Sequence, residues 1–277
     1  MLRPNWVQPR IGPLIRGGID YSSYPRQILL YRLFNKPLSS PNILNDFYAR
    51  FLYKKMTEYD YFKKINTDVS KKITSNNLLV TFEGDGGRFG VLNGYNELIK
   101  KELISVTRTK WIEFVKSFKD VPIGINIRLG NDFKTAKTFD DHYKSEAIKT
   151  PVAWFVETLK IIRKSIGYDA AAYIVTDGSE SDIKEILALP NTYFVRPGCA
   201  ISDLLILSKA KVLLRSGGSS FSAWASFLGQ MPTISHPGQS MDQFNLINKY
   251  GYYTGEFMPN KHNEYLHSDI INSFVKK

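Results

Sequence analysis

The 277-residue sequence has almost no cysteine and no long hydrophobic run, and each lack excludes a class of protein. Its single cysteine, Cys199, excludes an internal disulfide and a metal cluster built from several cysteines. The apolar runs, such as residues 78–82 and 212–214, are far shorter than the roughly 20 residues that span a bilayer. The first residues contain no apolar stretch of the kind that a secretory signal has. We therefore expect a soluble, cytoplasmic protein without a metal site.

Negative charge is also scarce, because 37 lysines and arginines outnumber 26 aspartates and glutamates, for a formal net charge of +11. The excess is +9 over residues 1–118 and only +2 over residues 119–277. A basic first part could face nucleic acid, an anionic membrane surface or an anionic small molecule, or could be a solvated lysine-rich surface. No zinc-finger, RNP or KH pattern is present, so we expect no nucleic-acid partner. A peripheral contact with a membrane stays open.

The hydrophobic pattern is less regular before residue 119 than after it. Helical spacing predicts a helix over residues 43–56 and another over 94–104, and residues 78–82 are typical of a buried strand. After a boundary near residues 116–121, strands and helices alternate, which favours a parallel sheet covered by helices. The expected strands cover residues 123–127, 172–175, 192–195, 212–214 and 231–235. The expected helices cover 179–187, 202–209 and 219–228, and another opens at Thr150-Pro151.

Residue types at the helix ends support these ranges. Thr150 is expected as an N-cap with Pro151 at the first helical position, where its missing N–H costs nothing. Ser179 with Asp182 matches a capping box. Gly229 suits the position after a helix.

Two loops at the carboxyl ends of expected strands carry unusual side chains, and ligands of open parallel sheets bind at such ends. Arg128 follows the strand 123–127, and its guanidinium suits a phosphate, unless it pairs with Asp132 or a helix C-terminus. Asp177-Gly178 follows the strand 172–175. Asp177 could accept hydrogen bonds from a ribose or a base, unless this loop only caps the next helix.

A third loop, from Arg215 to Ser222, joins a strand to a helix and contains two glycines, four serines and no acid. Backbone N–H groups at the helix start, serine hydroxyls and the helix dipole predict an anion site. The loop is neither a Walker A loop nor a G-x-G-x-x-G fingerprint. The alternative is ordinary N-capping, for which one serine is enough.

These same residues resemble a known family. IGINIRLGNDF, residues 123–133, resembles the HxRRxD motif of the alpha-1,2-fucosyltransferases and related GT-B fucosyltransferases. Residues 201–229, with SSFSAWAS, resemble their D-x-x-x-(L/M)-S…SxFSxWGA segment, and YIVTDGSESDI is similar to the strand that lies between. The order and the spacing of the three segments agree with the family.

The resemblance implies an α/β fold of GT-B type with two Rossmann-like domains. Residues 1–118 would be the acceptor-side domain and residues 119–277 the nucleotide-sugar-binding domain. The family's opening glycine-rich segment has no counterpart, so the first domain is expected to lack its first strand–helix unit. The implied activity is inverting, metal-independent transfer of fucose from GDP-fucose to the hydroxyl of a glycan or lipid-linked glycan. No cofactor is implied besides this nucleotide-sugar substrate.

The resemblance also assigns roles by position. Arg128 would bind the β-phosphate of the donor and stabilise the charge of the leaving nucleotide. The residues expected at the diphosphate are Ser219, Ser220 and Phe221, with Ser222 closing the helix turn. The residues expected near the nucleoside are Asp177 and Asp203, and Gly178 is expected to contact the donor.

The general base and the catalytic competence stay open. Glu83 and Asp85 are candidate bases because their loop should face the cleft, although the loop could be a simple turn. His236 could line the same cleft or be structural. Asn126 stands where the motif has histidine and Leu129 where it has a second arginine. The alternative function is therefore an inactive protein that binds a nucleotide sugar or a glycan.

Overall fold

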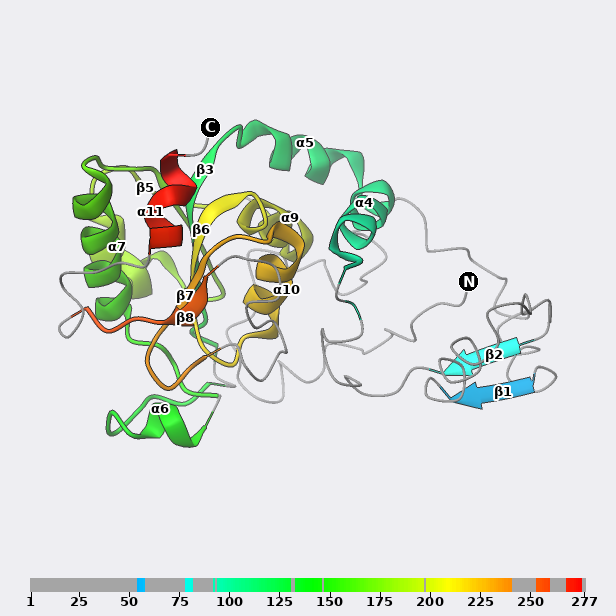
Figure 1. Cartoon of the computed structure of the whole chain (residues 1–277), viewed down its shortest axis with the longest axis horizontal. Helices are drawn as coiled ribbons and strands as arrows, with labels where there is room; N and C mark the ends of the chain where they lie inside the picture. Colours follow the sequence, from blue (N-terminus) through cyan, green and yellow to red (C-terminus); the bar gives the residue numbers. More distant parts are fainter. Residues whose placement is uncertain are drawn as a thin grey trace.

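A parallel β-sheet of six strands forms the centre of the computed structural model (Figure 1). The structure describes residues 54–57, 78–81, 92, 94–130, 133–145, 147–196, 198–240, 253–259 and 268–275. The strands are β3 (Val121–Ile127), β4 (Ala172–Thr176), β5 (Thr192–Phe194), β6 (Ala210–Arg215), β7 (Thr233–Ser235) and β8 (Thr254–Glu256). Their order is β5-β4-β3-β6-β7-β8, so the chain reverses direction across the sheet between β3 and β6. In such sheets this reversal opens a crevice beside the carboxyl ends of the two strands.

Helices cover both faces of the sheet, as Figure 1 shows. One face packs against α7 (Val152–Ile166), α11 (Ser268–Val275) and the short α8 (Lys184–Leu187). The other face packs against α9 (Ala200–Leu207), and α10 (Ser220–Gly229) packs beside α9.

The strand β3 shows why the sequence folds in this way. Its isoleucines Ile123, Ile125 and Ile127 are fully buried in the core on the α7 side. Each such side chain contributes about 1.5–3 kcal/mol by leaving water. The residue between the first two, Gly124, lies so close to the α9 side that a Cβ there would meet Leu207 at 3.2 Å. Apolar residues on both faces therefore make β3 a central strand.

The predicted α/β class with a Rossmann-like parallel sheet is confirmed. All five predicted strands of the second part exist, with ends that differ by at most two residues. The sequence did not indicate β8, α11 or α5 (Thr109–Ser117). Within the described part of the chain, no helix is both long enough and apolar enough to cross a membrane.

The prediction of a helix over residues 43–56 is wrong at residues 54–56, the part of this range that the structure describes. Residues Lys54–Thr57 form the strand β1, which pairs in parallel with β2 (Leu78–Thr81). The hydrogen-bond ladder to β2 prevails there over the local helical spacing. The remainder of that range lies outside the described residues. The strand expected over 78–82 is confirmed as β2.

Two of the three predicted helix ends need correction. The N-cap of α7 is Pro151 rather than Thr150, because the Thr150 hydroxyl has partners in distant loops. Gly229 lies inside α10, and Gln230 takes the left-handed conformation with φ 49°. The capping box of Ser179 and Asp182 is confirmed.

The helices before residue 118 pack onto the second part of the chain. α4 (Asn96–Val106) contacts α10, and α5 contacts α9. The helix α4 occupies most of the predicted range 94–104. The boundary at residue 118 and the incomplete first domain stay predictions, because most of residues 1–95 lie outside the described part.

Candidate functional site

The loops after β3 and β6 are tied together where the chain reverses direction. The backbone N–H of Ser216 donates to the carbonyl of Asn126 at 2.9 Å, which extends the β3–β6 pairing by one residue. The Ser216 hydroxyl in turn accepts from the backbone N–H of Arg128 at 2.9 Å. The sequence-predicted Arg128 therefore lies beside the glycine-serine loop, at the carboxyl ends of β3 and β6. We call this place the crevice, because sheets with this strand order open one there.

Asp177 holds the start of the loop that follows β3. One carboxylate oxygen accepts from the backbone N–H of Leu129 at 2.7 Å, and the other from that of Gly130 at 3.1 Å. The second oxygen also forms an ion pair with Nη1 of Arg128 at 2.5 Å. Asp177 is buried, whereas the Arg128 side chain is 27% exposed. The carboxylate thus fixes a guanidinium that remains accessible at the rim of the crevice.

Gly178, predicted to contact the donor, lies in the same turn. Its N–H donates to the Thr176 hydroxyl at 2.9 Å. A Cβ at this position would approach Leu129 to 2.6 Å. The turn after β4 therefore packs directly against the loop after β3.

The glycine-serine loop caps α10, which was the alternative interpretation of this loop, and the anion site stays a prediction. The Ser219 hydroxyl accepts from the N–H of Ser222 at 3.4 Å and donates to Oδ1 of Asn126 at 3.3 Å. Ser222 is buried, and its hydroxyl donates to the Ser219 carbonyl at 3.0 Å. Ser220 is exposed at the helix start, and Phe221 packs half-buried against the core on the α9 side. Of the predicted diphosphate residues, Ser220 is thus at the rim, while Ser222 holds the loop from inside.

A fully buried arginine, Arg215, lies beneath this loop. Its Nε donates to the Ser222 hydroxyl at 3.1 Å. Its Nη1 and Nη2 lie 3.5 Å from the Ser235 hydroxyl and the Ser219 carbonyl. A guanidinium in a low-dielectric interior raises the electrostatic potential at the loop above it. Sequence reasoning treated Arg215 only as the first residue of the loop. The one available signal was its position at the end of the apolar strand AKVLLR.

The loop after β7 supports the glycine-serine loop from the other side. The N–H of Gly217 donates to the Thr150 hydroxyl at 3.3 Å, and Thr150 donates to Oε1 of Gln239 at 2.6 Å. Gln239 also donates to the Ile148 carbonyl at 2.8 Å. A Cβ on Gly217 would lie 2.2 Å from the Gln239 side chain, so only glycine fits. This close approach fixes the course of the loop.

Asp203, the other residue predicted near the nucleoside, is buried in the first turn of α9. Burial raises the pKa of its carboxyl to about 7, and attraction by Arg196 opposes this rise. A Cβ on Gly198 would lie 2.3 Å from Oδ1 of Asp203, so the carboxylate packs against the loop after β5. It therefore lies at the carboxyl edge too, on the β5 side of the crevice.

His236 follows β7 and lies on the opposite side of the crevice from β5. Its ring packs against His142 of α6 (Asp141–Lys144), with ring centroids 4.3 Å apart. Nδ1 lies 2.7 Å from the Pro237 carbonyl, so Nδ1 carries the proton and Nε2 is an acceptor. Burial, and to a smaller extent the neighbouring His142, lower the pKa of His236 to about 4.

The candidate bases Glu83 and Asp85 lie outside the described residues, as does Asp132. Their roles stay predictions. Asn126, at the position of the motif's histidine, uses its side chain to accept from Ser219.

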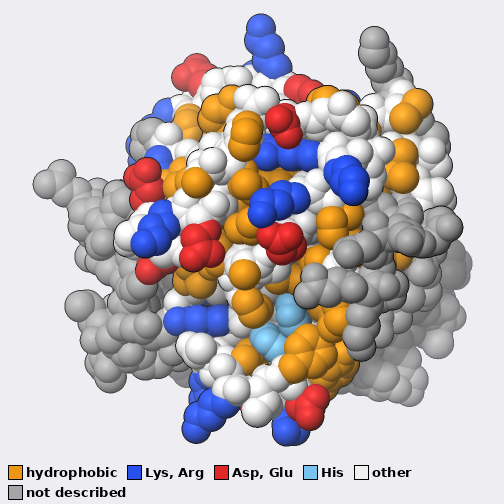
Figure 2. All heavy atoms as spheres, turned by 90° about the vertical axis from the view of Figure 1, so that its left-hand side faces the viewer, with side chains coloured by type: hydrophobic (Ala, Val, Ile, Leu, Met, Phe, Trp, Pro, Cys, Tyr) orange, Lys and Arg blue, Asp and Glu red, His pale blue; other side chains and the backbone are white. Residues whose placement is uncertain are grey.

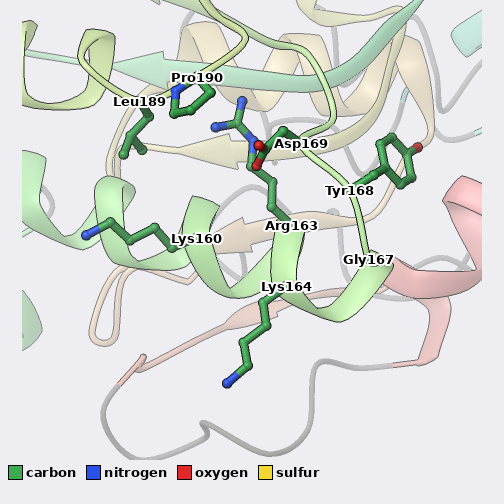
Figure 3. Close-up of a pocket in the computed structure, with 8 residues that line it drawn as sticks. All are labelled: Lys160, Arg163, Lys164, Gly167, Tyr168, Asp169, Leu189 and Pro190. Atoms are coloured by element: carbon green, nitrogen blue, oxygen red, sulfur yellow. The ribbon is translucent and has the colours of Figure 1, made fainter.

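A hollow of about 460 Å³ lies at the opposite, amino edge of the sheet (Figure 3). Arg163 of its lining donates to the carbonyls of Ala170 and Asn191, which lead into β4 and β5. In Figure 3 the Lys160 and Lys164 side chains point in different directions. The basic groups of this hollow therefore do not converge on one ligand.

The strand order and the tied loops at its carboxyl edge define a Rossmann-like α/β domain. No family model and no curated protein matches the chain. Solved structures that match include POFUT1 in complex with GDP, at 13% identity and a TM-score of 0.38. That alignment covers 64% of this chain and 58% of that chain, so this chain spans less than two thirds of it.

A NodZ alpha-1,6-fucosyltransferase soaked with GDP-fucose matches at 14% identity and a TM-score of 0.39, over 65% of this chain and 60% of that one. POFUT1 in its apo form matches at 10% identity and a TM-score of 0.38, over 77% and 78%.

Proposed function

We propose that this protein is a glycosyltransferase that binds a nucleoside diphosphate sugar at the crevice between β3 and β6. The observation that carries the proposal is the junction of Arg128, held by Asp177, with the glycine-serine loop at the start of α10. The donor that the sequence motifs favour is GDP-fucose. The acceptor is the hydroxyl of a glycan, free or lipid-linked, and an enzyme acting on the latter would contact a membrane at its surface.

Three sources of positive potential converge on this junction. The guanidinium of Arg128 is accessible at the rim, and that of Arg215 is buried beneath the loop. The first turn of α10 contains no acidic residue, and backbone N–H groups at a helix start lack partners within the helix. A diphosphate is an anion of the size and charge that such an arrangement stabilises.

The proposed reaction is a single displacement. An acceptor hydroxyl oxygen forms a bond to the anomeric carbon while the bond from that carbon to the β-phosphate oxygen breaks. The hydroxyl proton passes to a base, for which Glu83 and Asp85 are the candidates. Negative charge grows on the leaving diphosphate, so groups that stabilise it there lower the barrier. Arg128 and the start of α10 would have this role.

The alternative is a protein that binds the nucleotide sugar without turning it over. Asn126 favours it, because this residue stands where the motif has histidine and its amide holds Ser219. The Leu129 side chain packs beside Gly178 where the motif has a second arginine. Both substitutions remove polar groups that the family would direct at the donor, and both leave the loop junction intact.

Titration of the protein with GDP, UDP and dTDP, followed by calorimetry, tests the proposal. We expect GDP to bind and Arg128→Ala to weaken it about 10–100-fold, since a charge-assisted contact contributes about 1.5–3 kcal/mol. Lys164→Ala, at the distant hollow, is the matched control and should leave the affinity unchanged. Release of GDP from GDP-fucose in the presence of glycan acceptors then separates the two functions.

Binding of GDP-fucose without turnover across an acceptor panel favours the inactive binding protein. Absence of any response to the three nucleotides contradicts both functions. If Lys164→Ala weakens GDP binding as much as Arg128→Ala does, the nucleotide does not bind at Arg128.

A further inference from the structure

A segment between β3 and α7 leaves the sheet and carries α6. Both of its ends touch the loops of the proposed diphosphate site. At its start, the Arg128 guanidinium lies 5.5 Å from the centre of the Phe133 ring. At its end, Thr150 accepts from Gly217. Figure 1 shows α6 beyond the carboxyl ends of the strands. The segment therefore lies next to the crevice.

The base of this segment is closed by a parallel bridge between Lys134 and Ile148. The N–H of Lys134 donates to the Ala147 carbonyl, and the N–H of Lys149 donates to the Lys134 carbonyl, both at 2.8 Å. This closure gives the segment a fixed base, independent of β3 and α7.

Five aromatic side chains gather where this segment meets the loop after β7, and we call them the histidine platform. They are Phe139, His142, Tyr143, Trp154 and His236. The His236 ring centre lies 4.3 Å from that of His142 and 5.7 Å from those of Phe139 and Trp154. Figure 2 shows the two histidines, pale blue, beside hydrophobic side chains at the surface.

The platform differs from core packing because its rim is exposed. Phe139 is 45% exposed and Tyr143 59%, and their ring centres lie 5.8 Å apart. Two large aromatic rings side by side in water present apolar faces that a flat, partly apolar ligand can cover.

The platform also has polar atoms that suit a hydroxylated ligand. Nδ1 of His142 is buried and has no hydrogen-bond partner among the described residues. In His236 the bond from Nδ1 to the Pro237 carbonyl makes Nε2 an acceptor. A buried nitrogen without a partner calls for an explanation such as a ligand or an ordered water. Sites for small ligands commonly combine such a nitrogen with aromatic walls.

We infer that the histidine platform binds a pyranose ring, and we assign it to the sugar of the donor. The inference rests on the proposed function, which puts the diphosphate at the β3–β6 crevice. Asp203 and the predicted nucleoside lie on the β5 side of that crevice, whereas the platform lies on the β7 side. A donor that spans the crevice therefore extends its sugar toward the platform. The ring would stack on the aromatic faces, and its hydroxyls would donate to the imidazole nitrogens.

The test compares GDP-fucose with GDP by calorimetry in Phe139→Ala and in Tyr143→Ala. We expect each variant to bind GDP-fucose about 5–20-fold more weakly and GDP within twofold of the unchanged protein. Retained GDP binding also shows that the variant has folded. Tyr168→Ala is the matched control, because Tyr168 is 51% exposed at the opposite edge of the sheet. It should change neither affinity.

Three other outcomes are informative. If the unchanged protein binds GDP but both platform variants bind GDP-fucose normally, the inference fails and the proposed function stands. If only KM for a glycan acceptor rises in the variants, the ring belongs to the acceptor and the donor assignment is overturned. If the unchanged protein binds no GDP, the proposed function itself falls.

Discussion

The two edges of the same sheet both carry arginines, yet they use them in different ways. At the amino edge, Arg163 donates to Ala170 and Asn191 carbonyls in the connections that lead into strands. At the carboxyl edge, Arg215 supports a glycine-serine loop from beneath, and Arg128 remains partly exposed above it. The same residue type thus joins connections at one edge and supports the proposed anion site at the other. A count of positive charges would not separate them, because the distinction lies in what each guanidinium contacts.

Of the substitutions that test this comparison, Arg215→Met should change stability and GDP binding most. The buried hydroxyls of Ser222 and Ser235 lose a donor, so we expect the free energy of unfolding to fall by about 3–5 kcal/mol. Denaturant unfolding measures this change. At temperatures where the variant is folded, GDP should also bind more weakly, because the potential under the loop is lost.

The matched variant is Arg163→Met at the amino edge. It should lower the free energy of unfolding by about 1–3 kcal/mol, because the carbonyls of Ala170 and Asn191 lose their donor, and leave GDP affinity unchanged. If Arg163→Met weakens GDP as much as Arg215→Met does, the two edges do not differ in the way described here.

A second effect concerns acidic residues at the two edges. Asp203 is buried, and its pKa of about 7 in the folded protein lies above the ordinary 3.8. A raised folded pKa means that stability is fully present below pH 4 and is lost as pH rises toward about 7. At roughly 1.4 kcal/mol per pKa unit, the loss is at most about 4 kcal/mol.

Asp203→Asn removes the ionisation, so we expect it to match the unchanged protein near pH 4 and to exceed it in stability at pH 8. Thermal unfolding from pH 4 to pH 8 measures the difference. Asp169→Asn is the control, because Asp169 is exposed at the amino edge and its loss should matter little at any pH. His236 has the opposite effect on the pH dependence of stability, because its lowered pKa removes stability as pH falls from about 6.5 to about 4. This effect is the same in both variants and in the unchanged protein, so it cancels in the comparison.

The smallest effect compares a partly buried ion pair with an exposed one. In Asp177→Asn, the amide cannot accept both backbone N–H groups and pair with Arg128, so we expect a loss of about 1–3 kcal/mol in stability. GDP affinity should fall about 10-fold, because the guanidinium is no longer held in place. In Glu157→Gln, the exposed pair with Lys160 is lost, with an expected cost below about 1 kcal/mol. Equal losses in the two variants would mean that Asp177 does not position Arg128.

The sequence predicts the strands and the three loops well because both depend on local pattern. Apolar runs mark strands such as β3 and β6, and parallel strands bring the residues after them to one edge. Contacts between residues far apart in the sequence could not be predicted in this way, because no local pattern marks them. The pairing of Asp177 with the loop of Arg128 joins residues 48 positions apart, and Thr150 finds Gln239 across 89. The strand β8 has only three residues, Thr-Gly-Glu, and no apolar run to reveal it.

The bridge between Lys134 and Ile148 has a consequence for how this protein can change. It holds the two ends of the segment that carries α6 side by side at the base of the segment. We therefore expect changes of length or sequence beyond this bridge to alter the histidine platform while β3 and α7 keep their places. Evolution, or an engineer, could then vary the proposed sugar contacts separately from the proposed diphosphate contacts.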